Sequence, residues 1–435
     1  MMTDPLGVAL IGCGTVGAGV AHLLLSQRER LANQAGRPLS LRHVIVRQLD
    51  RVRPVELPGG ILSTDLDRVL HDPQVHVVAE LVGGTGWARQ AALRVLAAGK
   101  DLVTANKALL ATHGVEVFEA ARQHGRAIAF EAAVAGGVPI IAALTQGLAA
   151  NAILSLQGIL NGTSNFILSA MTDQGQSYAQ ALAEAQTRGY AEADPTLDVD
   201  GTDAAHKLAI LAQIAFGLTI PLQSIERNGI AGIDVTDIRF ARELGYVIKL
   251  LAETWMHEEE VALHVSPVLL RRQSPLAQVR GAYNAVAVVG DAVEDTLFYG
   301  KGAGMMPTAS AVVADLIDLA IGRSHREFQT RRLWTQTRTP VRLLPAARVK
   351  SRFYLRLHVE DRPGVLAEVA SVLAQHHISI ASVIQHEAPD EAEGQRVHLV
   401  IMTHAALTGN FRAACERLSQ LASIAGPAAH FPVED

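Results

Sequence analysis

The chain has 435 residues but very little cysteine, with Cys13 near one end and Cys415 near the other. Two cysteines so far apart give neither a disulfide framework nor a zinc motif, which fits a reducing cytoplasm. Positive charge is also scarce, because 38 Lys and Arg are outnumbered by 43 Asp and Glu. The sequence therefore lacks the basic field that nucleic-acid binding requires. We expect a cytoplasmic protein without a nucleic-acid partner.

A long uninterrupted apolar run is absent as well. Crossing a bilayer takes about 20 predominantly apolar residues, and the uncharged stretches 132–151 and 208–225 are both interrupted by Gly and Pro. The first residues carry no basic segment followed by an apolar one, so we expect no secretory signal and no membrane partner. Hydrophobic residues still make up 49% of the chain, which predicts large buried cores.

The first 130 residues alternate short apolar runs with stretches of helical spacing. Such runs are typical of buried parallel strands, and repeated βαβ units predict an α/β fold with a Rossmann-type doubly wound parallel sheet. We assign this domain to residues 1–135 and expect a helix near 305–322 to complete it. The expected strands are 8–11, 44–46, 75–82, 102–104 and 128–130.

The rest of the chain is predicted to hold an α+β domain at 136–322, with helices such as 203–216 and 237–253. Residues 323–350 are rich in Arg, Gln, Thr and Pro without sustained apolar periodicity, which indicates a linker. From 351 to 435 the order strand, helix, two strands, helix, strand predicts a ferredoxin-like module.

Gly12, Gly14 and Gly17 form a Gly-x-Gly-x-x-Gly turn between the first expected strand and a helix. In a dinucleotide site the first glycine makes the tight turn and the second lets the backbone approach the pyrophosphate. The third lets helix and strand pack closely. The alternative is a glycine-rich turn in an α/β domain that binds no nucleotide. The context of this turn favours a nicotinamide cofactor.

Arg47 follows the second expected strand, where NAD enzymes place a carboxylate for the ribose 2′-hydroxyl. Arg51 and Arg53 lie close behind it. A carboxylate repels a 2′-phosphate, whereas arginine binds it through paired charge-assisted hydrogen bonds. The pattern favours NADP over NAD. The alternative is a solvated basic loop, with Asp50 at the ribose and NAD as the cofactor.

Five carboxylates and one lysine lie within residues 189–207. Pro and Gly exclude regular helix in the acidic half, whereas Asp203 and Lys207 share one face of the helix that follows. An enzyme that interconverts a carbonyl and an alcohol needs a proton donor and a grip on its substrate. Lys207 is the candidate for the proton, and Glu192 or Asp203 for a substrate ammonium group. The alternative is an exposed Asp–Lys pair worth about 0.3–0.5 kcal/mol.

Three other segments carry weaker signals. Lys107 follows the fourth strand, where open α/β sheets bind ligands, and it either contacts a ligand or caps the turn. Thr163 stands at a helix start, and we take it as the helix cap rather than a ligand contact. Gly304 ends a Gly-Lys-Gly-Ala-Gly turn suited to close backbone approach. The remaining acids, Asp194, Asp198 and Asp200, either shape the acidic loop or tune Lys207.

Together these segments resemble homoserine dehydrogenase, in its monofunctional form with a C-terminal ACT domain, over essentially the whole chain. The stretch 189–207 carries the strongest likeness, and blocks at 104–107, 131–139, 158–163 and 300–304 are similar in the same order. The resemblance implies reversible NAD(P)H-dependent reduction of L-aspartate 4-semialdehyde to L-homoserine, in threonine, methionine and isoleucine biosynthesis. It also implies a homo-oligomer, a dimer or a tetramer, with 136–322 as its catalytic and dimerisation domain.

By position, the resemblance makes Lys207 the proton donor and acceptor, with Glu192 and Asp203 at the amino-acid end of the substrate. It implies cofactor contacts from Thr15, Val16, Lys107, Gly189 and Gly304, with Arg47 at the 2′-phosphate. In one departure from the family, Gly86-Trp87 stands where a proline-containing turn is expected. This departure leaves the local contact to nicotinamide open.

The resemblance further implies a sodium ion and an effector. The sodium ligands are Glu131 and the main-chain carbonyls of Val134, Gly136 and Val138, and oxygen donors suit such a hard cation. The C-terminal module, 351–435, resembles an ACT domain whose first turn, 360–366, implies feedback inhibition by an amino acid, most readily threonine. The alternative is an ACT domain that only dimerises the protein.

Overall fold

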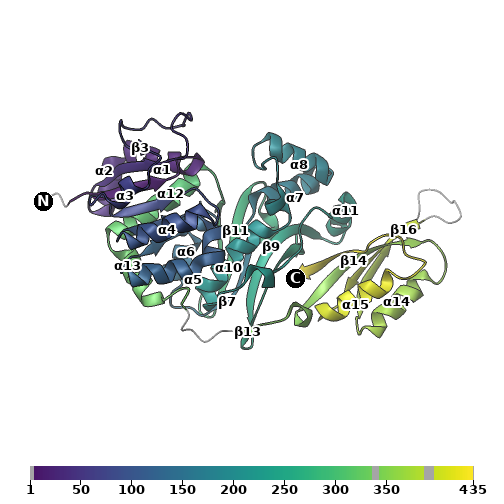
Figure 1. The fold of residues 1–435 in the computed structure, drawn as a ribbon. Helices are drawn as coiled ribbons and strands as arrows, with labels where there is room; N and C mark the ends of the chain where they lie inside the picture. Colours follow the sequence, from purple (N-terminus) through teal and green to yellow (C-terminus); the bar gives the residue numbers. More distant parts are fainter. Residues whose placement is uncertain (1–3, 336–341, 387–395, 435) are drawn as a thin grey trace. The chain divides into compact units, whose positions relative to one another are not determined.

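A computed structural model describes residues 4–335, 342–386 and 396–434, and Figure 1 traces their fold. The chain divides into two compact units. Their ranges are Met1–Leu154, Ala205–Ile225 and Asn284–Val341 for unit 1, and Ser155–Ala204, Glu226–Tyr283 and Arg342–Asp435 for unit 2. The division falls within helix α10 (Thr202–Phe216), so this one helix belongs to both units.

Unit 1 contains the doubly wound parallel sheet, with strand order β3-β2-β1-β4-β5-β6. Strand β1 is buried at every position, as expected for a strand with helices on both faces. The predicted Rossmann-type fold is therefore confirmed. The strands are β1 (Leu6–Ile11), β2 (Leu39–Ile45), β3 (Leu62–Ser63), β4 (Val77–Glu80), β5 (Asp101–Thr104) and β6 (Ile128–Ala129).

Helices and one hairpin complete unit 1. Helix α12 contributes Ala309, Val312 and Leu316 to the same hydrophobic core as β1 and α1. Segment 323–350, where the sequence indicates a linker, contains helix α13, and Phe328 of that helix stacks on Phe118 at 5.4 Å. The elements are α1 (Thr15–Ser26), α2 (Arg28–Ala35), α3 (Asp67–Leu70), α4 (Trp87–Ala97), α5 (Lys107–Gln123), α6 (Ile140–Ala142), β11 (Tyr283–Gly290), β12 (Glu294–Lys301), α12 (Met305–Ala320) and α13 (Arg323–Arg331).

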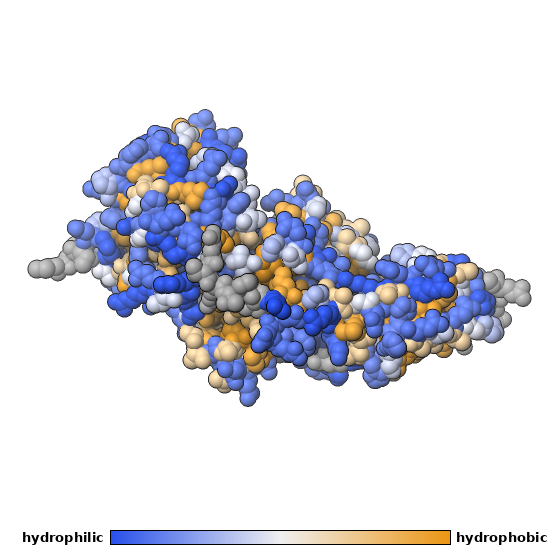
Figure 2. All heavy atoms as spheres, turned by 60° about the horizontal axis from the view of Figure 1, so that its bottom comes forward, coloured by the Kyte–Doolittle hydropathy of each residue, from blue (hydrophilic) through white to orange (hydrophobic). Residues whose placement is uncertain are grey.

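Within the described ranges, no single helix is long and apolar enough to cross a membrane, although α12 and α13 pass that test as a pair bent by 87°. Figure 2 shows a mostly hydrophilic surface with apolar residues gathered in patches. Large apolar side chains are exposed on and beside hairpin β11–β12, including Val293, Leu297 and Tyr299.

The strands of the second sheet that belong to unit 2 follow the order β7-β9-β10-β18-β14-β16-β15. Its last four strands belong to the C-terminal module, and β18 pairs in parallel with β10 through Leu269 and Val433. The predicted ferredoxin-like βαββαβ order is confirmed. The strands are β7 (Ile153–Ile159), β8 (Glu226–Arg227), β9 (Tyr246–His257), β10 (Glu260–Arg271), β13 (Arg342–Leu343), β14 (Lys350–Glu360), β15 (Ile380–Gln385), β16 (Arg396–Thr403), β17 (Ala406–Leu407) and β18 (Ala429–Glu434).

The predicted helix over 237–253 is wrong in its second half. Helix α11 ends at Glu243, and Gly245 turns the chain at a φ of +87° into strand β9. Residues 248–254 of β9 are all buried, so the strand shows no alternation of apolar and polar positions. Periodicity alone does not separate such a strand from a buried helix.

The helices of unit 2 position the acidic stretch. The prediction that Pro and Gly exclude regular helix there holds except for α9, a single turn that begins after Pro195. The helices are α7 (Gly162–Gln174), α8 (Tyr178–Thr187), α9 (Thr196–Val199), α11 (Val235–Glu243), α14 (Val365–Gln375) and α15 (Thr408–Leu418).

Candidate active site

The glycine turn joins β1 to α1 in unit 1. Gly12 has a φ of +102°, and its amide donates to the Ile45 carbonyl at 2.8 Å. A Cβ on Gly17 would lie 2.2 Å from the Gly12 carbonyl oxygen, so only glycine fits where the helix approaches the turn. A Cβ on Gly14, by contrast, would meet no protein atom within 4 Å. This open backbone at a helix N-terminus is the cradle that a dinucleotide pyrophosphate needs.

A cavity of 890 Å³ opens beside this turn. Its lining includes Arg47 and Arg51, whereas Asp50 does not line it in the part of the chain that the structure describes. Arg53 also lines it but is engaged in holding its own loop, where it donates to the carbonyls of Leu49 at 2.9 Å and Arg51 at 2.7 Å. Two of the three arginines thus remain as candidates for a 2′-phosphate.

Trp87 is the first residue of α4 and lines the same cavity, with half of its surface exposed. It occupies the place where the family resemblance predicts a proline-containing turn. An indole there offers a large flat surface at the cavity wall.

Glu80 organises the loops at the carboxyl ends of β4 and β5, and sequence reasoning missed it. Its buried carboxylate accepts from the amides of Val82 and Gly83 at 3.0 and 3.1 Å and from the Thr104 hydroxyl at 2.8 Å. An acid at the end of a buried strand was the available signal. Asn106 then caps α5 through Leu109 N at 3.1 Å. The cap of this turn is therefore Asn106, not the adjacent Lys107.

The acidic stretch is organised around Asn161, in unit 2. Its Oδ1 accepts from the Ser164 amide at 2.8 Å and so caps α7. Its Nδ2 donates to Asp198 at 2.7 Å and to Asp203 at 2.9 Å. One side chain therefore fixes two carboxylates that lie 37 and 42 residues away in sequence.

The prediction that Thr163 caps the helix is wrong, because Asn161 fills that position. The Thr163 hydroxyl lies 2.7 Å from the Tyr190 carbonyl and 3.0 Å from Asp198 Oδ2, and its proton is shared between these acceptors. Thr163 thus ties α7 to the acidic stretch. A threonine hydroxyl can donate only one proton. The Asn161 side chain, by contrast, accepts from the helix N–H through its oxygen and donates to both carboxylates through its nitrogen.

The other acids of the stretch separate into loop-shaping and exposed groups. Asp194 accepts from the Thr196 hydroxyl at 2.6 Å, and hydrogen bonds from Thr196 lower the pKa of Asp194. Asp200 accepts from the Thr202 amide at 2.8 Å, where α10 begins. Glu192 lies on the exposed surface of the loop.

Helix α10 carries Asp203 and Lys207 one turn apart, as the spacing predicts. Asp203 is buried in the Asn161 network, whereas Lys207 is half-buried. The spacing of four residues places the carboxylate and the lysine on the same face of the helix.

Lys249 on β9 is a buried lysine that the sequence did not suggest. Its ammonium group donates to Asn165 Oδ1 at 2.9 Å, and burial lowers the pKa of Lys249 to about 8. It also donates to the Val279 carbonyl. These bonds join β9 to α7, so Lys249 supports the helix that Asn161 caps.

Glu131 and the loop 134–138 lie together in unit 1, where the sodium ligands are predicted. The Glu131 carboxylate accepts from the amides of Ile141 at 3.0 Å and Ala142 at 2.7 Å. Burial raises the pKa of Glu131 to about 7. Among the described residues no group of three His, Cys, Asp or Glu side chains could hold a metal. A cation here would therefore depend on main-chain carbonyls.

Gly304 begins α12 with a φ of +123°, and Gly189 ends the segment after α8 with a φ of +74°. Both positions suit close approach of a ligand to the backbone. The structure places Gly304 in unit 1 and Gly189 in unit 2. Beside Gly302, Asn284 is buried and its amide atoms have no hydrogen-bond partner within the described residues.

A Rossmann sheet with an open glycine turn, a cavity at its carboxyl edge and a lysine-bearing helix define a nicotinamide-dependent oxidoreductase. Comparison with known proteins gives the family. Family models for homoserine dehydrogenase match residues 139–317 and, for its NAD-binding domain, 12–131, while an ACT domain model matches 353–422. The chain belongs to the homoserine dehydrogenase family.

Relatives match over their full length. A homoserine dehydrogenase from Pseudomonas aeruginosa is 42% identical over 99% of this chain and 99% of its own. The crystal structure of one from Thiobacillus denitrificans is 44% identical, with a TM-score of 0.92 over 99% of this chain and 98% of that one. A Staphylococcus aureus structure is 33% identical, with a TM-score of 0.76 over 99% of both chains.

Proposed function

We propose that this chain interconverts L-aspartate 4-semialdehyde and L-homoserine, with NADP(H) preferred over NAD(H). The observation that carries the proposal is helix α10, on which Lys207 follows the hydrogen-bonded Asp203 by one turn. The bound nicotinamide supplies or accepts the hydride. The chain itself must hold the substrate, exclude water and move one proton at the substrate oxygen.

Lys207 moves that proton. In the reduction its ammonium group donates to the oxygen that becomes the hydroxyl, and in the oxidation its amine takes the proton back. Asp203 lies four residues before Lys207 on helix α10, and its carboxylate accepts a hydrogen bond from Asn161. The carboxylate on the same helix face as Lys207 is therefore held in one position. Glu192, on the exposed loop, and Asp203 bind the substrate ammonium group.

The assay that tests this proposal is NADP⁺ reduction by L-homoserine. We expect activity in the wild-type chain and a loss of about 10²–10⁴ in kcat for Lys207→Met, the range of general acid–base catalysis. Lys350→Met, on an exposed lysine of β14, is the matched control and should keep full activity. Inactive wild-type protein, or an active Lys207→Met variant, would refute the proposal.

The substrate grip has its own test. 4-Hydroxybutyrate is L-homoserine without the amino group, so a carboxylate that binds the ammonium should discriminate between the two. We expect Glu192→Gln to raise KM for L-homoserine about tenfold and to leave KM for 4-hydroxybutyrate unchanged. An equal change for both substrates would assign Glu192 a structural role only.

Glu131 and the carbonyls of Val134, Gly136 and Val138 are proposed to hold sodium. The donors are all oxygen, and each carboxylate oxygen that accepts one amide keeps a second lone pair. A cation would also offset the burial that disfavours the charged form of Glu131. We expect the wild-type chain to unfold at a higher temperature in NaCl than in choline chloride, and Glu131→Gln to lose that difference.

The ACT domain is proposed to bind an amino-acid effector at the turn 360–366, and threonine is the first candidate. Support comes from the ACT family match and from an exposed turn in which Arg362 pairs with Glu360 at 2.9 Å. Threonine should inhibit the wild-type enzyme and not Gly364→Leu.

Exposed apolar side chains on hairpin β11–β12 support a homo-oligomer, which sedimentation would measure.

A further inference from the structure

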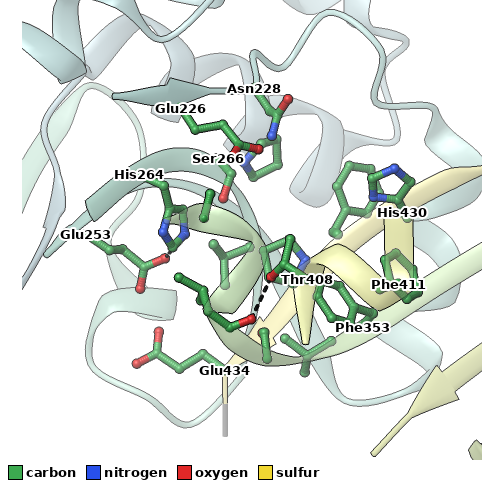
Figure 3. A pocket seen from close by; sticks show the side chains of 18 of the residues that line it. Glu226, Asn228, Glu253, His264, Ser266, Phe353, Thr408, Phe411, His430 and Glu434 are labelled. Atoms are coloured by element: carbon green, nitrogen blue, oxygen red, sulfur yellow. Dashed lines mark hydrogen bonds and ion pairs between the residues drawn. The ribbon is translucent and has the colours of Figure 1, made fainter. Parts of the chain in front are cut away.

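Unit 2 contains an open cavity of 590 Å³ that no step of the proposed reaction uses. Its walls come from β8, β9 and β10 on one side and from β14, α15 and β18 of the ACT domain on the other (Figure 3). Neither the acidic stretch 189–207 nor the turn 360–366 contributes to this lining within the described ranges. The cavity is therefore distinct from both the proposed active site and the proposed effector turn.

Two carboxylates meet at one end of the cavity. Glu253 is buried and pairs with His264 Nε2 at 3.0 Å. The Gln157 amide donates to Glu253 at 3.2 Å and also to Glu434. Figure 3 shows the carboxyl groups of Glu253 and Glu434 facing each other. One amide thus holds together two acids that would otherwise repel.

Glu434 has fewer partners than Glu253. His264 can neutralise one of the carboxylates, and Glu434 Oε2 is buried without a hydrogen-bond partner in the described part of the chain. Burial and the neighbouring Glu253 raise the pKa of Glu434, whereas Gln157 and His264 lower it by less. The cavity is also lined by Arg412, which pairs with Glu226, by Arg352, which donates to the Thr403 carbonyl at 3.2 Å, and by the exposed Lys350, and in the part of the chain that the structure describes none of them is a hydrogen-bond partner of Glu434 Oε2.

Ser266 supplies an independent sign of a missing ligand. It lines the cavity and is 4% exposed, and its hydroxyl has no hydrogen-bond partner among the residues that the structure describes. Figure 3 places it between Glu226 and His264. Polar atoms buried this deeply are almost always hydrogen-bonded in native proteins. A primary ammonium group has three donors and no acceptor, which suits an unpaired carboxylate oxygen and a hydroxyl.

The opposite end of the cavity is aromatic. Phe353 and Phe411 stack with ring centroids 3.9 Å apart, and His430 lies against Phe411 at 5.4 Å. Figure 3 shows these rings together on the side away from Glu253. An acidic end and an aromatic end select a molecule with a cationic head and an apolar tail.

We propose that this cavity binds a small primary amine with an apolar tail. The ammonium group lies between Glu434, Glu253 and Ser266, and the tail packs on Phe353 and Phe411. The alkylammonium group can belong to a simple amine or to an apolar amino acid, and the experiment separates these sources. The site is independent of the proposed reaction, because no residue of the acidic stretch contributes to it.

Calorimetric titration of the full chain with three probes of one skeleton tests the site. Isoamylamine has the amine alone, L-leucine has amine and carboxylate, and 4-methylpentanoate has the carboxylate alone. We expect isoamylamine to bind and 4-methylpentanoate not to bind. Binding of L-leucine as well assigns the site to amino acids, and its failure to bind assigns the site to amines without a carboxylate.

Variants locate the binding. Glu434→Gln should weaken isoamylamine about tenfold or more, because a charge-assisted hydrogen bond is lost, and Ser266→Ala by about threefold. Glu416→Gln, on an exposed glutamate of α15 outside the lining, should bind as the wild type does. Glu434→Gln keeps the size and hydrogen-bonding capacity of the side chain, so we expect the variant to fold. Thermal unfolding will check that it does.

A second measurement counts protons. A cation beside Glu434 favours its ionised form, so binding near pH 7 should release a fraction of a proton in the wild type and none in Glu434→Gln. Titrations in buffers of different ionisation enthalpy give this number. Absence of binding by both amine probes, equal binding of 4-methylpentanoate, or unchanged affinity in folded Glu434→Gln would each overturn the proposal.

Discussion

The glycine turn, proposed to hold the cofactor, and the acidic stretch, proposed to hold the substrate, are built in opposite ways. The turn uses backbone and missing side chains: Gly12, Gly14 and Gly17 lie within six residues. The acidic stretch uses side chains that converge across the fold, with Asn161 as their common partner. A local turn is set mainly by sterics, whereas the network forms only when α7, α9 and α10 have packed.

The difference predicts how each region fails. A wrong residue in the turn meets backbone that cannot yield, so folding and cofactor binding suffer. A substitution in the Asn161 network leaves the fold intact but leaves a buried carboxylate without its hydrogen-bond donor. Substitutions at Gly17 and Asn161 test this contrast directly, and substitutions at Arg47 and Glu131 test two other parts of the proposed site.

The largest effect is expected from Gly17→Val. Its Cβ would lie 2.2 Å from the Gly12 carbonyl oxygen, so the turn must open, at about 3 kcal/mol or with loss of soluble protein. Gly14→Ala is the matched control, since a Cβ there meets no atom within 4 Å. It should unfold as the wild type does and bind NADPH at least tenfold more weakly. Equal stability of both variants in urea unfolding would contradict the assigned roles.

Next in size is Asn161→Leu, which removes the cap and both carboxylate bonds. We expect kcat/KM for L-homoserine to fall about 100-fold, because Asp198 and Asp203 each lose a donor. Asn161→Asp sharpens the test, because a carboxylate can still accept from Ser164 while placing a third negative charge beside the other two. It should keep more stability than the leucine variant and still lose activity. Full activity in Asn161→Asp would show that the network does not matter.

Arg47→Ser should have an intermediate effect on one cofactor alone. Removing a bidentate partner of the 2′-phosphate should raise KM for NADP⁺ about tenfold and leave KM for NAD⁺ unchanged. The same change in Arg53, which holds its own loop, should affect both cofactors. If Arg47→Ser changes both values in parallel, the 2′-phosphate assignment is wrong.

The smallest effect concerns pH. The folded-state pKa of Glu131 is raised to about 7 from an ordinary 4.5, so the folded chain binds this proton more tightly than the unfolded chain. This group therefore destabilises the fold increasingly as pH rises from 4.5 through 7. Between pH 5 and pH 8 the wild type should lose about 1–2 kcal/mol of unfolding free energy that Glu131→Gln keeps, as measured by urea unfolding in choline chloride. A bound sodium ion would lower the pKa and reduce the slope of the wild type in NaCl.

The sequence predicted what depends on local spacing. The parallel sheet, the glycine turn, the βαββαβ order of the C-terminal module and the shared face of Asp203 and Lys207 all follow from local spacing, whereas the resemblance identified that module as an ACT domain. The sequence did not predict the roles of Asn161 and Glu80, because their hydrogen-bond partners are distant in sequence and come close only in the fold. Strand β9 was not predicted, because it is buried on both faces and its sequence therefore shows no alternation of apolar and polar residues. A hydroxyl at the start of a helix predicts a cap at Thr163, but the Asn161 side chain, two residues earlier, caps α7 instead.

The parallel pairing of β10 with β18 has a consequence for any attempt to shorten the chain. The last strand of the ACT domain, β18, pairs with β10 in the middle of the chain, so the ACT domain is not an independent module that can be deleted without affecting the rest. It would expose Leu269 and Leu270 on an open strand edge, and such edges recruit other chains and aggregate. A variant that lacks the proposed feedback inhibition is therefore better sought by point substitution than by truncation.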